Sequence, residues 1–378
     1  MYAVTEDQRS IVQMVRQFAQ DELAPRAAEW DETHYFPTDV LRKAGELGMG
    51  GIYTREDFGG SGLSRSDSVL IFEELAKGDT TIAAYISIHN MVTWMIDTYG
   101  NDLQRAEWIP QLASMDALGS YCLTEPGAGS DAAALTTRAT RDGDDFILNG
   151  VKQFISGAGS SAVYVVMART ADTGSRGISA FIVPDGVSGL SFGPLEKKMG
   201  WHAQPTRQVI FEDVRVPASS LLSKEGDGFG IAMNGLNGGR VNMGACSLGG
   251  GQFALDRTVR YLTERVAFGK PLIQNPALLF QLADMDTQLE AGRSLLHRAA
   301  EAMDSKAADL VRLCAMAKLV ATDAGFNVAN AALQLHGGYG YLSEYGIERI
   351  VRDLRVHQIL EGTNEIMRLI VGRTLAEA

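Results

Sequence analysis

The stretch TTRATRDGDDFIL, residues 136–148, indicates the fold class more directly than any other part of the chain. Its two ends are β-branched or apolar, and the turn signal Asp142-Gly143-Asp144 lies between them, a pattern typical of a β-hairpin. Further apolar or β-branched runs occupy residues 162–168, 178–183 and 208–211 and are bounded by Gly, Pro and Asp. Successive strands without intervening helices predict a small barrel or sandwich in residues 116–225.

Helical patterns lie on both sides of this β region. Thr5 and Gln8 have the spacing of a capping box, and apolar residues follow at helical intervals. Further helices fit residues 38–47, 66–77 and 80–99, and long Ala- and Leu-rich helices fit 280–296 and 310–324. We therefore expect a mainly α protein with a central β domain: an N-terminal helical domain (1–115), a middle β-barrel domain (116–225) and a C-terminal four-helix bundle (226–378).

Composition restricts the partners and the compartment. A formal net charge of -12 argues against a general binder of nucleic acid or anionic membranes, which need clustered Lys and Arg. No apolar run is long enough to span a bilayer, and the N-terminal segment lacks the pattern of a secretory or mitochondrial leader. The cysteines (Cys122, Cys246 and Cys314) are widely spaced, and the histidines show no HExxH-type pair. We expect reduced thiols, no catalytic metal and a cytoplasmic protein.

Four short motifs could contribute to a binding site. YCLTEPGAGSD at 121–131 is a Gly-rich turn after a strand, where backbone N–H groups can approach a flat or anionic ligand. In GVKQFIS at 150–156, Phe154 could flank a ring and Ser156 could hydrogen-bond its edge. RVAFG at 265–269 offers Arg265 to a pyrophosphate, and QLHGGYGY at 334–341 bends at two glycines. Taken singly, each is more often an ordinary loop, strand, solvated arginine or helix end.

The fifth motif is EGTNE at 361–365. Glu361 follows two apolar residues and precedes a glycine, so it could lie at the floor of a pocket. A carboxylate with apolar neighbours has a raised pKa and can act as a base near neutrality. In isolation, such a Glu is more often a favourable partner of a helix dipole. The joint order of the five motifs is far more specific than any one of them.

In this order the motifs resemble the acyl-CoA dehydrogenase family over essentially the whole chain. The resemblance implies the family's fold, FAD as cofactor, an acyl-CoA substrate and Glu361 as the catalytic base. It also implies electron-transfer flavoprotein as electron acceptor and an oligomer, typically a homotetramer. The residues that it places at the flavin of the same subunit are Tyr121, Leu123, Thr124, Gly129, Ser130, Phe154, Ile155, Ser156, Thr363 and Glu365.

Two further residue sets follow from the same resemblance. Those expected to reach the FAD of a neighbouring subunit are Arg265, Phe268, Asn275, Gln334, Gly337 and Gly338. Those expected to contact the acyl-CoA are Ser130, Asn237, Arg240, Gly362 and Arg373. Pro276 stands where many relatives carry a Gln that contacts FAD. Proline has no side-chain amide, so it cannot make that hydrogen bond. Some relatives place the base just before the arginine that corresponds to Arg240, but Gly239 holds that position here.

Within the family, residues 84–100, 235–240 and 352–362 are most similar to members that convert isobutyryl-CoA to methacrylyl-CoA in valine breakdown. Short-chain and 2-methyl-branched acyl-CoA dehydrogenases share most of the same motifs and stay open as alternatives. Two other classes also stay open. One is a flavoprotein of the same fold that is not a dehydrogenase, such as an acyl-CoA oxidase, and the other is a helical interaction protein without cofactor.

Overall fold

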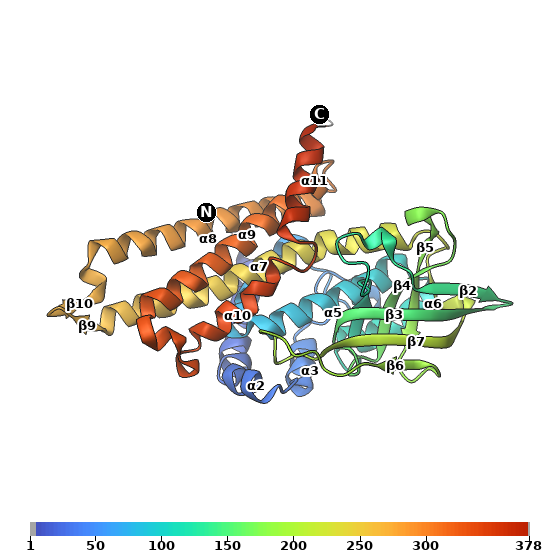
Figure 1. The fold of residues 1–378 in the computed structure, drawn as a ribbon, viewed down its shortest axis with the longest axis horizontal. Helices are drawn as coiled ribbons and strands as arrows, with labels where there is room; N and C mark the ends of the chain where they lie inside the picture. The colour runs from blue at the N-terminus through green and yellow to red at the C-terminus, as the bar shows by residue number, and fades with distance from the viewer. Residues whose placement is uncertain (1–4, 377–378) are drawn as a thin grey trace.

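The computed structural model describes residues 5–376, in which a β region lies beside a long helical body (Figure 1). The N-terminal helices are α1 (Glu6–Phe18), α2 (Ala27–Thr33), α3 (Thr38–Glu46), α4 (Arg65–Gly78), α5 (Thr80–Tyr99) and α6 (Asp102–Ala113). The predicted capping box is confirmed, because Gln8 N donates to Thr5 Oγ1 and Thr5 N donates to Gln8 Oε1, both at 3.1 Å. The helices expected at 38–47, 66–77 and 80–99 are also confirmed.

One curled sheet forms the β region. Its strands are β1 (Gly119–Cys122), β2 (Arg138–Asp142), β3 (Asp145–Ser156), β4 (Val163–Arg169), β5 (Ile178–Pro184), β6 (Leu190–Phe192), β7 (Thr206–Pro217) and β8 (Leu221–Leu222). They pair in the order β6-β7-β3-β2-β4-β5-β8, and β1 pairs in parallel with β4. The predicted hairpin is β2–β3, with Gly143 at φ 63° in its turn. Within residues 5–376 no pairing joins β6 to β8, so the barrel is open along that side.

The C-terminal region consists of α7 (Gly228–Glu264), the small hairpin β9 (Val266–Ala267) and β10 (Lys270–Pro271), α8 (Pro276–Asp304), α9 (Leu310–His336), α10 (Ile347–His357) and α11 (Asn364–Ala376). The helices α7, α8 and α9 run side by side, and α11 projects from the body (Figure 1). Glycines allow the close packing: a Cβ at Gly249 would lie 2.2 Å from Glu73 O on α4, and one at Gly325 would lie 2.3 Å from Ser247 O on α7. None of the helices described is both long and apolar enough to cross a membrane.

The three regions meet along α5 and α7. Almost every residue of α5 is buried, because the helix packs against α4, α6 and α7 and against strand β1. The connections at 114–118 and 223–227 lie between the regions and contain the proposed domain boundaries. The loop between α10 and α11 carries Glu361. It is hydrogen-bonded to both α7 and α9, so it lies where these two helices meet.

Candidate active site

The loop between α10 and α11 holds Glu361 in an uncommon backbone conformation. Glu361 has φ 57° and Gly362 has φ 90°, so two successive residues are left-handed. A non-glycine residue in this region is unfavourable and persists only where its surroundings hold it. Here Arg240 Nε donates to Glu361 O at 3.1 Å, and Asn364 N donates to Gln358 O at 3.0 Å. The loop is thus fixed from α7 and by its own backbone.

The Glu361 carboxylate faces the middle of α7. A Cβ placed on Gly239 would lie 2.5 Å from Glu361 Oε2, so a side chain there would displace the carboxylate from this position. Oε2 is buried and accepts no hydrogen bond from the described residues, although the residue as a whole is partly exposed. Burial raises the pKa of Glu361 to about 7, against the opposite effect of Arg240 and Lys318. Such a carboxylate is suited to remove a proton near neutral pH.

Two buried cations flank this carboxylate. Arg240 on α7 donates from Nη1 to Asn237 Oδ1 at 2.8 Å, so these two predicted substrate residues lie together. Lys318 on α9 is fully buried, and its Nζ donates to Gly362 O at 2.9 Å and to Asn364 Oδ1 at 2.8 Å. Burial lowers the pKa of the Lys318 ammonium to about 7. The acid, the two cations and Asn237 thus form one cluster between α7, α9 and the loop.

The Tyr121 hydroxyl, on strand β1, is near enough to this cluster for the charge of Glu361 to act on it. It is buried and has no hydrogen-bond partner among the described residues. Burial first, and the charge of Glu361 second, raise the pKa of Tyr121 well above its ordinary value. The hydroxyl therefore stays protonated and available as a donor.

The predicted same-subunit flavin residues on β1, its following loop and β3 are brought together. Gln153 N donates to Thr124 O at 2.8 Å, and Ser120 Oγ donates to Ser156 O at 2.6 Å. A Cβ on Gly127 or Gly129 would meet nothing within 4 Å, so the Gly-rich turn is open to a ligand. Phe154, with φ 59°, is 63% exposed beside this turn. An open turn with free backbone groups and an exposed ring beside it fits a flat, phosphorylated cofactor such as FAD.

A buried ion pair fixes the base of that turn. Lys152 Nζ on β3 donates to Glu125 Oε1 at 2.8 Å and to Leu123 O at 3.0 Å. Glu125 also accepts hydrogen bonds from Thr136 and Thr137. Burial favours the neutral acid, but Lys152 and these donors outweigh it and lower the pKa of Glu125 to about 2.

The residues predicted to reach a neighbouring subunit lie elsewhere, at the end of the bundle that carries the β9–β10 hairpin, far from the sheet (Figure 1). Arg265 stacks over the Tyr339 ring with its Cζ 5.4 Å from the centroid, so it lies beside the 334–341 turn. A Cβ on Gly337 or Gly338 would meet nothing, and Phe268 is 100% exposed. One chain therefore does not bring the two predicted flavin sets together.

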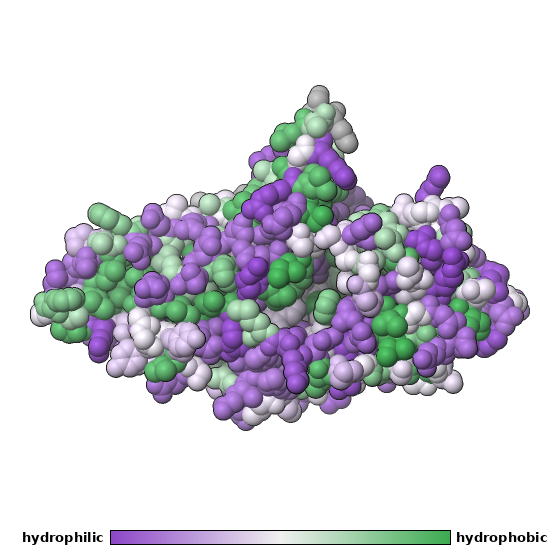
Figure 2. Space-filling model, in the orientation of Figure 1, coloured by the Kyte–Doolittle hydropathy of each residue, from purple (hydrophilic) through white to green (hydrophobic). Residues whose placement is uncertain are grey.

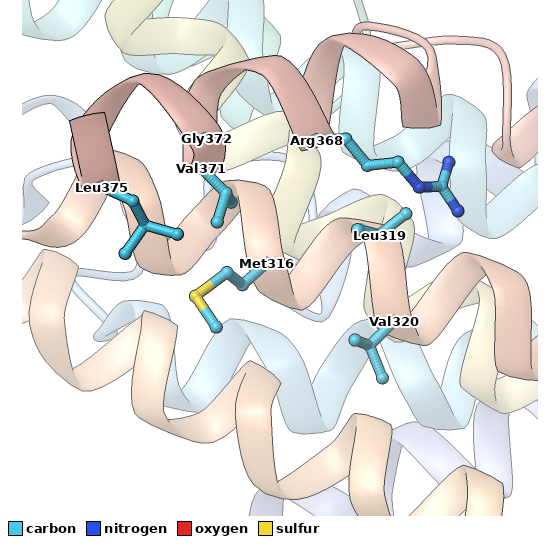
Figure 3. Close-up of a pocket in the computed structure, with 7 residues that line it drawn as sticks. All are labelled: Met316, Leu319, Val320, Arg368, Val371, Gly372 and Leu375. Carbon is cyan, nitrogen blue, oxygen red and sulfur yellow. The ribbon is translucent and has the colours of Figure 1, made fainter.

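The remaining predicted residues lie on α11 or at its start. Thr363 Oγ1 accepts from Ile366 N at 3.3 Å, while Glu365 and Arg373 are exposed. An apolar hollow of about 340 Å³ lies between α9 and α11, lined by Met316, Leu319, Val320, Arg368, Val371, Gly372 and Leu375 (Figure 3). Its lining does not include Glu361 and contains no side chain that could act as a base. The hollow is therefore a surface feature and not the catalytic pocket.

Two buried cations near the site were not predicted from the sequence. Lys318 interrupts the apolar pattern of 310–324, as Arg312 and Asp323 also do, so the sequence alone does not set it apart. Arg65, at the start of α4, stacks on the Tyr53 ring with its Cζ 3.4 Å from the centroid. Its buried Nη1 has no hydrogen-bond partner and lies 2.7 Å from where a Cβ of Gly238 would be. Nothing in the local sequence distinguishes Arg65 from a solvated arginine.

Comparison with known proteins gives matches over the whole chain. Family profiles described as acyl-CoA dehydrogenase N-terminal, middle and C-terminal domain match residues 5–116, 120–214 and 226–376. The chain is 53% identical over 375 residues to "Isobutyryl-CoA dehydrogenase, mitochondrial" of Dictyostelium discoideum and 51% identical over 374 residues to the Bos taurus protein of that name. Each alignment covers 99% of this chain and 90% of the relative.

A solved structure matches equally completely. A chain from a study described as "Electron transferring flavoprotein of Acidaminococcus fermentans" aligns with a TM-score of 0.97 and 40% identity, covering 100% of both chains. The similarity thus extends over all three regions of the fold and includes the loop that carries Glu361.

Proposed function

Since this chain belongs to the acyl-CoA dehydrogenase family, we propose that it desaturates isobutyryl-CoA to methacrylyl-CoA with Glu361 as the base. Its activity is acyl-CoA dehydrogenation and its cofactor is FAD. The observation that carries the catalytic assignment is the buried, unpartnered Glu361 Oε2, whose carboxyl has a pKa of about 7. No substituent at Gly239 competes for this space.

The chain's own residues carry out the proton transfer. Glu361 takes the α-proton, and removal of this proton is favoured when the thioester carbonyl is polarised by hydrogen-bond donors. The backbone N–H of Glu361 makes no hydrogen bond within residues 5–376 and can serve as one such donor. Arg240 and Asn237, joined at 2.8 Å, fix the wall of α7 against which the acyl-CoA lies. Burial of this cluster excludes water and holds the reacting groups close together.

We assign the cofactor to the open Gly-rich turn. Tyr121, Leu123, Thr124, Gly129 and Ser130 line the turn and its approach, and Phe154, Ile155 and Ser156 lie on the adjoining strand. Thr363 and Glu365 complete this set at the start of α11. These residues would hold FAD, which would supply the acceptor for the hydride from the β carbon of the substrate.

We also propose a homotetramer, because one chain separates its two flavin-binding sets. Arg265, Phe268, Asn275, Gln334, Gly337 and Gly338 would complete the FAD site of a neighbour. The bundle end that carries them also bears exposed apolar side chains, namely Val266, Phe268, Leu279, Phe280, Tyr341 and Leu342. Green, hydrophobic surface is visible at that end of the molecule in Figure 2. Light scattering after size exclusion tests this proposal, and a monomer that retains FAD would contradict it.

The choice of isobutyryl-CoA is supported by the names of the two relatives at 53% and 51% identity. The test is anaerobic loss of the flavin absorbance with isobutyryl-, 2-methylbutyryl-, isovaleryl-, butyryl- and octanoyl-CoA. Fastest reduction by isobutyryl-CoA is the expected result and fits a role in valine breakdown. Fastest reduction by a straight or longer chain would reject the substrate and retain the dehydrogenase. Rapid oxygen uptake during turnover would instead favour an oxidase.

We further propose electron-transfer flavoprotein as electron acceptor, in line with the description of the structural match at 40% identity. Reduction of purified electron-transfer flavoprotein by enzyme and isobutyryl-CoA is expected, and its absence would reject this partner. The three cysteines are free and buried, which fits a reducing compartment such as the cytoplasm. Cell fractionation tests that location.

A further inference from the structure

The loop that carries Glu361 is tied to two helices. From α7, Arg240 Nε donates to Glu361 O at 3.1 Å. From α9, Lys318 Nζ donates to Gly362 O at 2.9 Å, one residue beyond the base. Glu361 and Gly362 are the two left-handed residues of the loop, at φ 57° and 90°. A conformation of this kind depends on its anchors, and these two hydrogen bonds hold adjacent carbonyls.

The anchor on α9 is itself part of a buried network. Lys318 Nζ also donates to Asn364 Oδ1 at 2.8 Å, and Asn364 Nδ2 donates to Asp323 Oδ1 at 2.7 Å and to Thr322 Oγ1 at 3.1 Å. Asp323 Oδ1 also accepts from Gln358 Nε2 at 2.7 Å. Residues at both ends of the loop are thus connected through one turn of α9. Removal of the lysine would leave buried acceptors of the loop without their donor.

We propose that Lys318 is a positioning residue for the reaction: it holds the Glu361 loop in its catalytic conformation and provides a positive charge that favours the ionised form of Glu361. This inference rests on the proposed role of Glu361 as the base. Lys318 is fully buried and hydrogen-bonds the loop, so it acts through Glu361. The buried ammonium of Lys318 therefore combines a mechanical and an electrostatic effect on one carboxylate.

Other charged or titratable groups act on Glu361 and Lys318, one from each element packed around these two residues. They are Tyr121 on β1, Arg240 on α7, Asp323 on α9, His357 on α10 and Glu365 on α11. Burial lowers the pKa of His357 to about 3, so it stays neutral near pH 7. Burial raises the pKa of Tyr121 far above neutrality. Glu361 and Lys318 each have a pKa of about 7, so they respond in the neutral range and titrate as a coupled pair.

The test replaces Lys318 with Met in the FAD-loaded enzyme. Two rates are measured from pH 5.5 to 9.5: flavin reduction at saturating isobutyryl-CoA, and exchange of the acetyl-CoA α-protons for deuterium. Acetyl-CoA has no β carbon, so its exchange reports proton removal without hydride transfer. We expect the midpoint of both profiles to rise by about one pH unit, because an opposite charge near a carboxylate lowers its pKa by that order. The plateau should fall about tenfold or more as the loop loosens.

Three further variants make the result decisive. Lys318→Arg keeps the charge and should return the midpoint toward that of the wild type. Lys318→Gln keeps a donor without the charge, and should show the same upward shift even if the Met variant does not fold. Arg312→Met removes a partly exposed cation from the same helix, where it pairs with Asp309 at 3.0 Å, and should change neither value.

An unshifted midpoint in folded, FAD-loaded Lys318→Met or Lys318→Gln overturns the inference, since a merely structural role would lower the rate equally at every pH. Failure of the proposed function gives a different result, because the wild type itself would then show no flavin reduction by isobutyryl-CoA.

Discussion

Replacement of Lys152 by Met tests the physical account of the Gly-rich turn. The side chains of Lys152 and Glu125 are 0% and 4% exposed, and their charged atoms lie 2.8 Å apart. Glu125 also accepts from Thr136 N at 2.6 Å and from Thr137 N at 2.9 Å, so it links the turn after β1 to the start of β2. The variant would leave a buried carboxylate without its cation.

The size of the effect follows from the pKa of Glu125. Its environment holds that pKa at about 2 rather than 4.5, which corresponds to about 3 kcal/mol of stability at neutral pH. Breaking a buried ion pair from one side costs about 3–5 kcal/mol, in agreement. Without Lys152, burial would raise the pKa of Glu125 above 4.5. The destabilisation of the variant should therefore be largest at neutral pH and decrease as the pH falls and the carboxyl takes up a proton.

Urea unfolding of the apoprotein at pH 8 and pH 5, followed by circular dichroism, measures both features. The matched control is Arg141→Met, which removes a solvent-exposed pair with Glu225 in the same sheet and should cost less than about 1 kcal/mol. The double variant Lys152→Met with Glu125→Gln should recover part of the loss. A loss below about 1 kcal/mol for Lys152→Met, or a loss independent of pH, would refute the reasoning.

Three further predictions follow from other positions. Moving the base, with Gly239→Glu in a Glu361→Gly background, should restore flavin reduction at least about tenfold over Glu361→Gly alone, because a side chain at position 239 starts within 2.5 Å of the Glu361 carboxylate position; no gain would show that this region is not the catalytic one. Burial lowers the pKa of His89 to about 4 from 6.5, so stability should fall as the pH drops from 6.5 to 4, by up to about 3 kcal/mol. His89→Phe should make that slope shallower in acid unfolding curves, with buried His357 supplying part of what remains, and an unchanged slope would contradict the prediction. Gly157→Ala should destabilise by about 1–3 kcal/mol, since φ is +79° and its Cβ would lie 2.8 Å from the Tyr85 ring; thermal unfolding equal to the wild type would disagree.

Local patterns predicted much of the fold because local interactions determine them. The 136–148 hairpin was predictable, since its turn needs a glycine with positive φ, which Gly143 supplies at 63°. The start of α1 was predictable because Thr5 and Gln8 satisfy each other's backbone groups. The barrel's open side was not, because whether β6 pairs with β8 depends on the curl of the whole sheet.

The candidate site, like the fold, could be predicted from the sequence only in part. Glu361 was predictable from its motif, but the burial that raises its pKa depends on how the loop packs against α7 and α9. Lys318 is 43 residues from Glu361 in the chain, and only the packing of α9 against the loop reveals its role. The separation of the two flavin sets within one chain is likewise a property of the assembled helices.

The most direct test of the central claim is anaerobic flavin reduction by isobutyryl-CoA in Glu361→Gln. The amide keeps the shape of the side chain and cannot accept the α-proton, so FAD content and unfolding should match the wild type. The reduction rate should fall by about 10²–10⁴. A rate within about tenfold of the wild type would show that Glu361 is not the base.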